Sequence, residues 1–144
     1  MKSKKSLIHL INIPKISDDC YLCFAQNPDH IPFTVKRIYY ILKAQPSLPR
    51  GSHAHRKTQQ ILFCIQGNIT MSLDDGMKKE EVILDRPEVG IILDKMIWHE
   101  MHNFQKDTIL LVLASRKYEE KDYIRNYNQF LAIANGQNKK TNKI

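Results

Sequence analysis

The sequence predicts an all-β protein, a jelly roll or closed barrel of short strands with one C-terminal α-helix. Short runs rich in β-branched and aromatic residues alternate with turn signals along most of the chain, which is typical of sandwiches and barrels. Asp75-Gly76 lies between two such runs and favours a tight hairpin. A chain of 144 residues can bury one sizeable core. We expect one domain over residues 1–136 and a disordered basic tail over 137–144.

Proline, glycine, asparagine and aspartate separate the expected strands. These strands are Ile8–Ile13, Tyr21–Ala25, Thr34–Leu42, Gly51–His55, Gln60–Gln66, Asn68–Leu73, Glu80–Leu84, Gly90–Leu93, Trp98–Asn103 and Thr108–Ala114.

The expected helix lies near the C-terminus. Apolar side chains recur there at helical spacing, at Tyr123, Tyr127, Phe130 and Leu131. Acidic residues suit the start of a helix, and Glu119, Glu120 and Asp122 lie near the expected start. Gly136 suits its end. We expect the apolar stripe to pack on the barrel or on a second subunit.

The net charge of +7 is concentrated at the two ends of the chain. Residues 6–136 hold 16 basic and 15 acidic groups, so the body is nearly neutral and carries no recognisable basic module. We therefore expect no nucleic-acid partner. No apolar run is long enough to span a membrane, and the N-terminus does not read as a signal peptide. The three cysteines, Cys20, Cys23 and Cys64, fit reduced strand residues. We expect a cytoplasmic protein.

The pair His53 and His55 is the first candidate for a functional site. Side chains two apart on a strand share one face, so both imidazoles point the same way. Imidazole exchanges protons near neutral pH and is also the commonest metal ligand. Arg37 and Tyr39 share a face of another expected strand, which lines either a polar cavity or a solvent-exposed edge.

The spacing of His53, His55, Gln60 and Gly67 resembles the first motif of the cupin superfamily, whose fold is a small jelly-roll barrel (a double-stranded β-helix). His99 and Asn103 resemble part of its second motif. In metal-binding cupins the ligands are two histidines, a glutamate and a later histidine. Here Gln60 stands at the glutamate position, and a neutral amide weakens the hold on a divalent ion. Three histidines remain able to bind zinc or iron, so a metal-dependent cupin stays an alternative.

A longer series of motifs resembles the dTDP-4-oxo-6-deoxyglucose 3,4-ketoisomerases, the WxcM-like sugar-isomerase cupins. The series comprises Lys36 to Ile41, Arg50 to Lys57, Gln60, Gln66-Gly67, Leu73 to Gly76, Trp98 to Met101, Asn103-Phe104, Leu111 to Ser115, Tyr118 and Asp122 to Arg125. The N-terminal segment departs from the family, because Asp19 stands where the family often has an arginine.

The resemblance implies an isomerase that needs no cofactor and no metal. The substrate would be a dTDP-sugar with a ketone at C4, and a proton would move from C3 to C4 through an enediol. A non-catalytic module that binds sugar nucleotides remains a further alternative. The expected assembly is a homodimer, because a barrel this small leaves strand edges to cover.

The same resemblance implies roles for individual residues. His53 would be the base at C3, His55 would relay protons or stabilise the enediolate, and Tyr39 and His99 would be the donors to oxygen or to C4. Guanidinium groups match phosphate geometry, so Arg37 and Arg50 are candidates to bind the diphosphate or polar groups of the sugar. Gln60 would fix a histidine tautomer, Asn103 would contact substrate, and Trp98 would either stack on the substrate or form part of the barrel wall. His99 favours a galacto product, as in deoxyamino-sugar biosynthesis.

Overall fold

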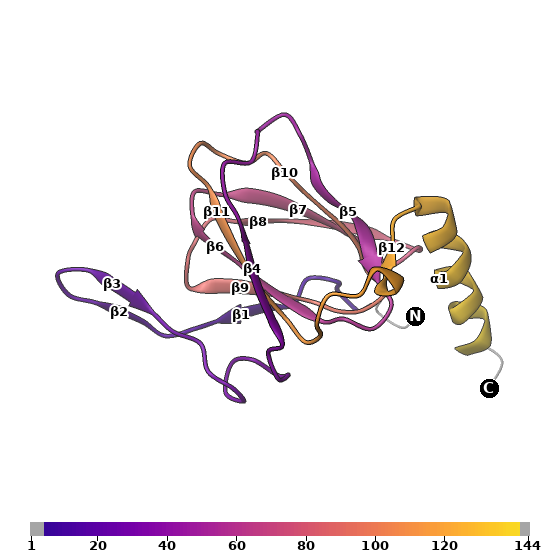
Figure 1. Ribbon diagram of the computed structural model, residues 1–144, viewed down its shortest axis with the longest axis horizontal. Helices are drawn as coiled ribbons and strands as arrows, with labels where there is room; N and C mark the ends of the chain where they lie inside the picture. The colour runs from indigo at the N-terminus through magenta and orange to yellow at the C-terminus, as the bar shows by residue number, and fades with distance from the viewer. Residues whose placement is uncertain (1–4, 142–144) are drawn as a thin grey trace.

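Two five-stranded antiparallel sheets enclose the core of the computed structural model, which describes residues 5–141 (Figure 1). The first sheet has the order β1 (Leu10–Asn12), β9 (Val89–Leu93), β6 (Gln60–Gln66), β11 (Ile109–Ala114), β4 (Arg37–Ile41). The second has the order β12 (Tyr123–Ile124), β5 (Arg50–His55), β10 (Trp98–His102), β7 (Ile69–Asp74), β8 (Lys79–Leu84). The predicted all-β class with one C-terminal helix is confirmed.

The core lies between the two sheets and follows from the alternation of side chains along each strand. In β7, Ile69, Met71 and Leu73 point inward and are fully buried. From the first sheet, Leu62 and Ile91 pack in the same cluster. Removing this apolar surface from water is the main favourable contribution to folding, at about 25 cal/mol per Å².

Every strand expected from the sequence is present, with ends that differ by a few residues. Asp75-Gly76 does lie in the connection of the antiparallel hairpin β7–β8, where Asp74 pairs with Lys79. Gly76 has a φ of +89°, and its N–H donates to the carboxylate of Asp74 at 2.7 Å. Aspartate and glycine therefore supply the turn chemistry that the pattern indicated.

The C-terminal region differs from the expectation. Tyr123 lies in β12, which pairs with β5, and the helix α1 (Tyr127–Thr141) begins four residues later. The acids expected at the helix start lie before it: Glu120 and Asp122 are in a 3₁₀ turn over Glu120–Asp122, and Glu119 directly precedes that turn. Asn126 accepts a hydrogen bond from the N–H of Gln129 at 2.9 Å and so caps the helix instead.

The expected helix end at Gly136 is also wrong, because α1 continues to Thr141. Residues 137–141 are therefore helical and not a disordered tail, and residues 142–144 lie outside the described part. Lys139 and Lys140 occupy the last turn, where the helix dipole favours positive charge. Phe130 and Ala134 on α1 pack against Trp98 of β10, so the barrel of the same chain covers the apolar stripe.

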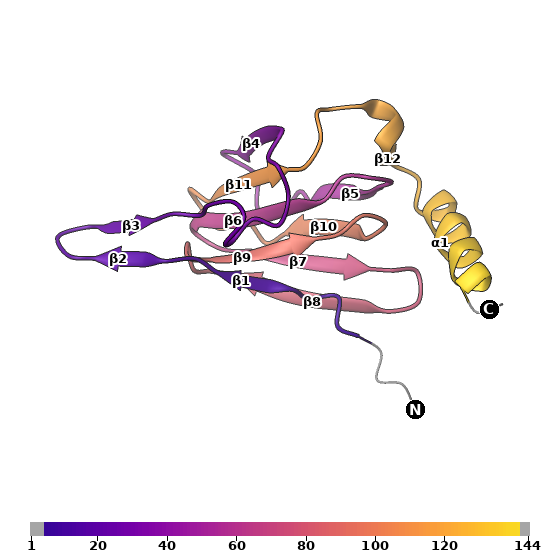
Figure 2. The same cartoon turned by 90° about the horizontal axis from the view of Figure 1, so that it is seen from below.

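A hairpin of β2 (Lys15–Ser17) and β3 (Tyr21–Cys23) extends away from the barrel at the end opposite α1 (Figures 1 and 2). The strand Lys15–Ser17 was not expected from the sequence. The three cysteines are free. Among residues 5–141, no helix has the length and apolar character needed to cross a membrane.

Candidate active site

A cavity of about 450 Å³ opens between the ends of β4, β5 and the segment around β12. Its walls carry aromatic, imidazole and guanidinium groups together with the apolar side chains of Ile41 and Met101. The lining residues relevant to chemistry are Arg37, Tyr39, Arg50, His53, Tyr118, Tyr123 and Arg125. The structure thus brings Arg37, Tyr39, Arg50 and His53, which were predicted from the sequence, to one cavity.

Strands β5 and β10 place three histidines side by side. His53 pairs with His99 across the two strands, and the ring centroids lie 4.5 Å apart. Gly51 makes this approach possible: it has a φ of +90°, and a Cβ there would lie 2.9 Å from the carbonyl oxygen of His99. The register shifts between His99 and Glu100, a bulge that redirects side chains locally. His55 lies behind His53, with ring centroids 4.9 Å apart.

Each histidine ring is held through its Nδ1 atom. His53 Nδ1 donates to the carbonyl oxygen of Gly51 at 3.0 Å. His99 Nδ1 lies 3.3 Å from the carbonyl oxygen of Ile97. His55 Nδ1 donates to the carboxylate of Asp122 at 2.9 Å. The Nε2 atoms of His53 and His55 lie 3.3 Å apart. The donor roles follow from the partners, because carbonyl and carboxylate oxygens only accept.

Asp122 is the main residue of the site that sequence reasoning missed, because it was assigned to the start of a helix. Its carboxylate is buried and also accepts hydrogen bonds from the Thr58 hydroxyl and, at 2.7 Å, from the N–H of Lys57. Burial raises the pKa of Asp122, but the hydrogen bonds from Thr58, His55 and Lys57 outweigh it and leave the pKa below its usual value. The carboxylate is therefore ionised at neutral pH. The signal in the sequence that could have revealed Asp122 was its place in the family-like motif Asp122 to Arg125.

Burial keeps the histidines neutral at neutral pH. It lowers the pKa of His53 to about 4. It also lowers the pKa of His55, an effect that the hydrogen bond to Asp122 opposes. His99 is fully buried, and burial together with the neighbouring His53 and His55 holds its pKa well below the ordinary value. Neutral imidazoles with unprotonated nitrogens can accept protons.

Tyr39 is held by Gln60 and not by a histidine. The Gln60 amide Nε2 donates to the Tyr39 hydroxyl oxygen at 2.9 Å, so the phenol proton remains free to be donated. The predicted role of Gln60 in fixing a histidine tautomer is therefore wrong, and Asp122 does this for His55. Burial raises the pKa of Tyr39 to about 12, against the lowering effect of the Gln60 hydrogen bond. The phenol stays protonated across the physiological range.

Positive charge lies at the cavity mouth. The Arg37 guanidinium lies 5.5 Å from the centroid of the Tyr39 ring and 5.8 Å from that of Tyr118, within reach of a cation–π interaction. Its Nε atom is buried without a hydrogen-bond partner among the described residues, and other atoms of the side chain line the cavity. Arg125 is already paired with Glu120, at 2.7 Å and 3.1 Å.

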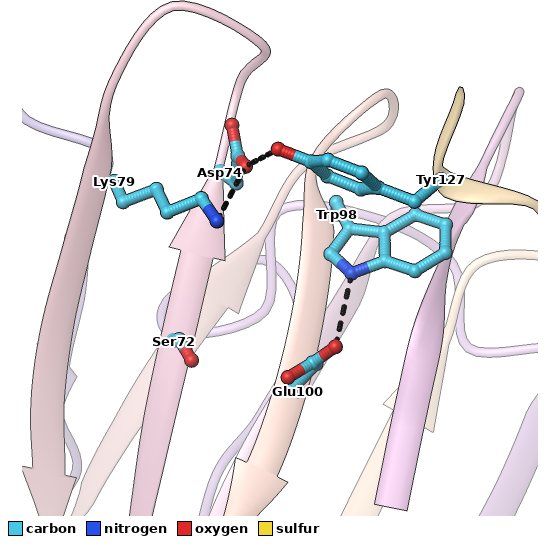
Figure 3. Close-up of a pocket in the computed structure, with 6 residues that line it drawn as sticks. All are labelled: Ser72, Asp74, Lys79, Trp98, Glu100 and Tyr127. Atoms are coloured by element: carbon cyan, nitrogen blue, oxygen red, sulfur yellow. Dashed lines mark hydrogen bonds and ion pairs between the residues drawn. The ribbon is translucent and has the colours of Figure 1, made fainter. Parts of the chain in front are cut away.

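The predicted residues that do not themselves line the cavity are His55, Gln60, Trp98, His99 and Asn103. His55 and His99 are buried against His53, and Gln60 is buried against Tyr39. Trp98 is next to His99 in β10 and so faces the other side of the sheet. There it packs on α1 and donates from its indole N–H to Glu100 at 3.3 Å (Figure 3). The barrel-wall alternative for Trp98 is the one that the structure favours. Asn103 follows β10, and its amide donates to Thr70 at 3.3 Å.

The three histidines are also the cluster to consider for a metal ion. One ring nitrogen from each lies within 4.8 Å of the others. The group contains only neutral imidazoles, because Gln60 is bonded to Tyr39 and Asp122 faces the Nδ1 atom of His55. A divalent ion held there would have no anionic ligand from the described residues of the cluster. The site therefore fits hard cations poorly, and zinc and iron are the ions that suit its imidazole ligands.

Comparisons with known proteins agree with these features. Residues 5–135 match the protein family described as FdtA: WxcM-like, C-terminal. A TDP-4-oxo-6-deoxy-alpha-D-glucose-3,4-oxoisomerase from Aneurinibacillus thermoaerophilus is 44% identical over 122 residues, which is 84% of this chain and 88% of that protein.

Solved structures give the same result. A 3,4-ketoisomerase from Helicobacter canadensis has 40% identity and a TM-score of 0.86, covering 89% of this chain and 97% of that one. A mutant of the QdtA 3,4-ketoisomerase from Thermoanaerobacterium thermosaccharolyticum, in complex with TDP-4-keto-6-deoxyglucose, has 35% identity and a TM-score of 0.87, covering 91% and 96%. The chain therefore belongs to the FdtA (WxcM-like, C-terminal) family of sugar 3,4-ketoisomerases, with the cupin-like barrel that its motifs predicted.

Proposed function

We propose that the protein converts dTDP-4-oxo-6-deoxyglucose into a dTDP-3-oxo-6-deoxyhexose by proton transfer through an enediol. The observation that carries the proposal is the convergence of the unprotonated His53 imidazole and a protonated phenol beside the guanidinium groups of Arg37 and Arg50 in one cavity, with the buried rings of His55 and His99 in contact with His53. Such a site supplies a base, an acid and anion-binding groups, which proton abstraction beside a carbonyl requires. The relative from Aneurinibacillus and the QdtA complex support the substrate class.

His53 is the proposed base. It lines the cavity, and its Nδ1 proton is bound to the Gly51 carbonyl oxygen, so its Nε2 atom is the one free to accept. Breaking the C3–H bond sends the proton to Nε2 and the electron pair toward the C4 carbonyl. A positioned base contributes typically about 10²–10⁴-fold to the rate.

Tyr39 is the proposed donor to oxygen. Its phenol is protonated and fixed by Gln60 at 2.9 Å. The product needs a hydroxyl at C4 and a ketone at C3, so one proton must pass from the C3 oxygen to the C4 oxygen. A phenol that gives its proton to one oxygen and takes one from the other would complete this exchange.

Arg37 and Arg50 are the proposed diphosphate contacts. Both line the cavity, and the Arg37 Nε atom has no partner within the described protein. Bidentate hydrogen bonds from guanidinium to phosphate are strong and directional. Trp98 and Asn103, which lie away from the cavity, are not part of this proposal.

His99 is the proposed donor to C4, which corresponds to a galacto product for deoxyamino-sugar biosynthesis. Its buried ring lies next to that of His53, with 4.5 Å between centroids, which places it on one side of the base. Delivery from the His99 side of the sugar would set the C4 configuration. Nuclear magnetic resonance of the product distinguishes galacto from gluco, and a gluco product would remove His99 from this role.

The decisive assay combines chelator-treated protein with dTDP-4-oxo-6-deoxyglucose in deuterium oxide. We expect the 3-oxo product to appear with deuterium at C4. His53→Asn should bind dTDP but turn over at least about 10²-fold more slowly, from the usual contribution of a general base. His102→Asn is the matched control, because His102 lies on β10 outside the cavity and interacts with Glu81 at 3.7 Å.

Two rival functions predict different results in the same assay. A metal-dependent cupin, favoured by the cluster of His53, His55 and His99, would lose turnover on chelation and recover it with zinc or iron. A sugar-nucleotide-binding module would bind dTDP-sugar without forming product or exchanging protons. Elemental analysis of the purified protein adds an independent check on the first.

The protein is also proposed to be a homodimer. The projecting hairpin carries Ile16, Tyr21 and Leu22, which are 53%, 70% and 52% exposed. An apolar hollow of about 500 Å³ runs from the hairpin onto the outer face of the first sheet, past Phe63 and Leu113. Exposed apolar patches of this kind commonly mark interfaces. Light scattering at micromolar concentration should give twice the chain mass of 16.9 kDa, and a monomer would contradict the proposal.

A further inference from the structure

A continuous series of contacts runs from the buried carboxylate of Asp122 to the ring that faces the cavity. His55 Nδ1 lies 2.9 Å from Asp122, His55 Nε2 lies 3.3 Å from His53 Nε2, and His53 Nδ1 lies 3.0 Å from the Gly51 carbonyl oxygen. The residues at the two ends of this series, Gly51 and Asp122, offer only acceptor oxygens to the rings.

Counting donors fixes the tautomers. Each neutral imidazole carries one N–H. In His53 that hydrogen must lie on Nδ1 to meet the Gly51 carbonyl, and in His55 it must lie on Nδ1 to meet Asp122. Both Nε2 atoms then present a lone pair to each other across 3.3 Å. A hydrogen bond between them therefore forms only when the pair takes up one additional proton.

We propose that Asp122 is a positioning residue that makes His53 and His55 a two-centre base, in which the proton removed from C3 is held between the two Nε2 atoms. This inference rests on the proposed function. The C3–H bond breaks, its electrons enter the enediolate, and the proton closes the Nε2–Nε2 hydrogen bond. The protonated pair carries one positive charge, which the negative charge of Asp122 balances. Passing the proton on toward C4, with His99 as the proposed final donor, restores the neutral pair.

Asp122 is the carboxylate placed to act as this counter-ion. It is the acid that bonds directly to the pair among the described residues, and Thr58 and Lys57 hold it in position. Arg37 from β4 and Arg125 after β12 place positive charge near the rings. Glu120 is another acid near His53, but it is paired with Arg125 and does not bond to either ring. His99 on β10 and Tyr123 on β12 are the remaining titratable groups that contact the rings.

The test measures the tautomers directly in the full-length protein labelled with ¹⁵N-histidine. Two-bond ¹H–¹⁵N correlations distinguish a proton on Nδ1 from one on Nε2. We expect Nδ1–H for His55 in the unmodified protein. In Asp122→Asn the amide donates to Nδ1, which moves the His55 proton to Nε2 and points it at His53. The lone pair of the base is then occupied.

We expect Asp122→Asn to lower kcat at least about tenfold while KM changes less than about threefold, since a wrong tautomer costs about 10⁴-fold in a serine-protease triad. Thr58→Val is the matched control: it removes another hydrogen bond of the same carboxylate and should keep the Nδ1–H tautomer. Tight binding of dTDP by each variant reports that the cavity is intact.

Two results would overturn the inference. One is an Nε2–H tautomer of His55 in the unmodified protein, a measurement that needs no variant to fold. The other is an Asp122→Asn protein that keeps its turnover within about twofold. If the unmodified protein isomerises no sugar, the proposed function fails, yet the tautomer measurement still decides whether the two Nε2 atoms form a single proton-accepting pair.

Discussion

The proposed base should remain active well below the pH at which an ordinary histidine becomes protonated. Burial lowers the pKa of His53 to about 4. A base works only in its neutral form. At pH 5 a group with a pKa of about 4 is about 90% neutral, whereas a histidine with its usual pKa of about 6.5 is about 3% neutral. We therefore expect kcat/KM at pH 5 to stay close to its value at pH 7.5, where an unshifted base would give a fall of about thirtyfold.

The assay measures initial rates of 3-oxo product formation at low substrate concentration, because kcat/KM reports the pKa values of the free enzyme. Folding must be followed at each pH. His53 and His55 have lower pKa values in the folded protein than in the unfolded chain. The unfolded chain therefore binds more protons below about pH 6.5, and the free energy of unfolding falls as the pH drops from there toward about 4.

The refuting result is specific. If kcat/KM falls tenfold per pH unit below about pH 6.5 while circular dichroism shows a folded protein, the base is either solvated or a group other than His53. A rate that is retained at pH 5 and lost near pH 4 would agree with the burial of this ring in the folded protein.

Three further perturbations test other parts of the structure. Tyr39→Phe should lower turnover at least about 10²-fold and reduce the free energy of unfolding by about 1–3 kcal/mol, because the buried Gln60 amide loses its acceptor; unchanged rates in the isomerase assay would exclude Tyr39 as the acid. Gly67→Ala should cost about 1–3 kcal/mol in urea unfolding, because Gly67 has a φ of +77° and a Cβ would lie 2.3 Å from Thr108 Oγ1; a variant as stable as the parent would contradict this. Phe130→Ala removes a fully buried ring between α1 and the barrel and should cost about 3–5 kcal/mol; a loss below about 1 kcal/mol would mean that α1 is not firmly docked.

Local patterning was sufficient to predict much of this protein. The alternation of side chains along a strand predicted that His53 and His55 share a face, and the structure places them 3.3 Å apart at Nε2. The same alternation, applied to Trp98 and His99, already required that these neighbours face opposite sides, so the stacking alternative for Trp98 could have been dropped.

The helix boundary was not predictable in this way. Tyr123 and Ile124 fit a helical period equally well, and only pairing with His55 and Ala54 makes them a strand. Long-range pairing of this kind overrides local preference, because the buried ladder contributes more than the intrinsic tendency of two residues.

The sequence by itself therefore determined every strand except Lys15–Ser17 and Tyr123–Ile124, the face that carries the paired histidines and the family to which the chain belongs. Only the tertiary structure decided what holds these rings: Asp122 lies 67 residues from His55 along the chain, and Gln60 bonds to Tyr39. The physical reason is that a proton's position on an imidazole depends on whichever acceptor the fold brings within about 3 Å, and spacing along the chain carries no information about that distance.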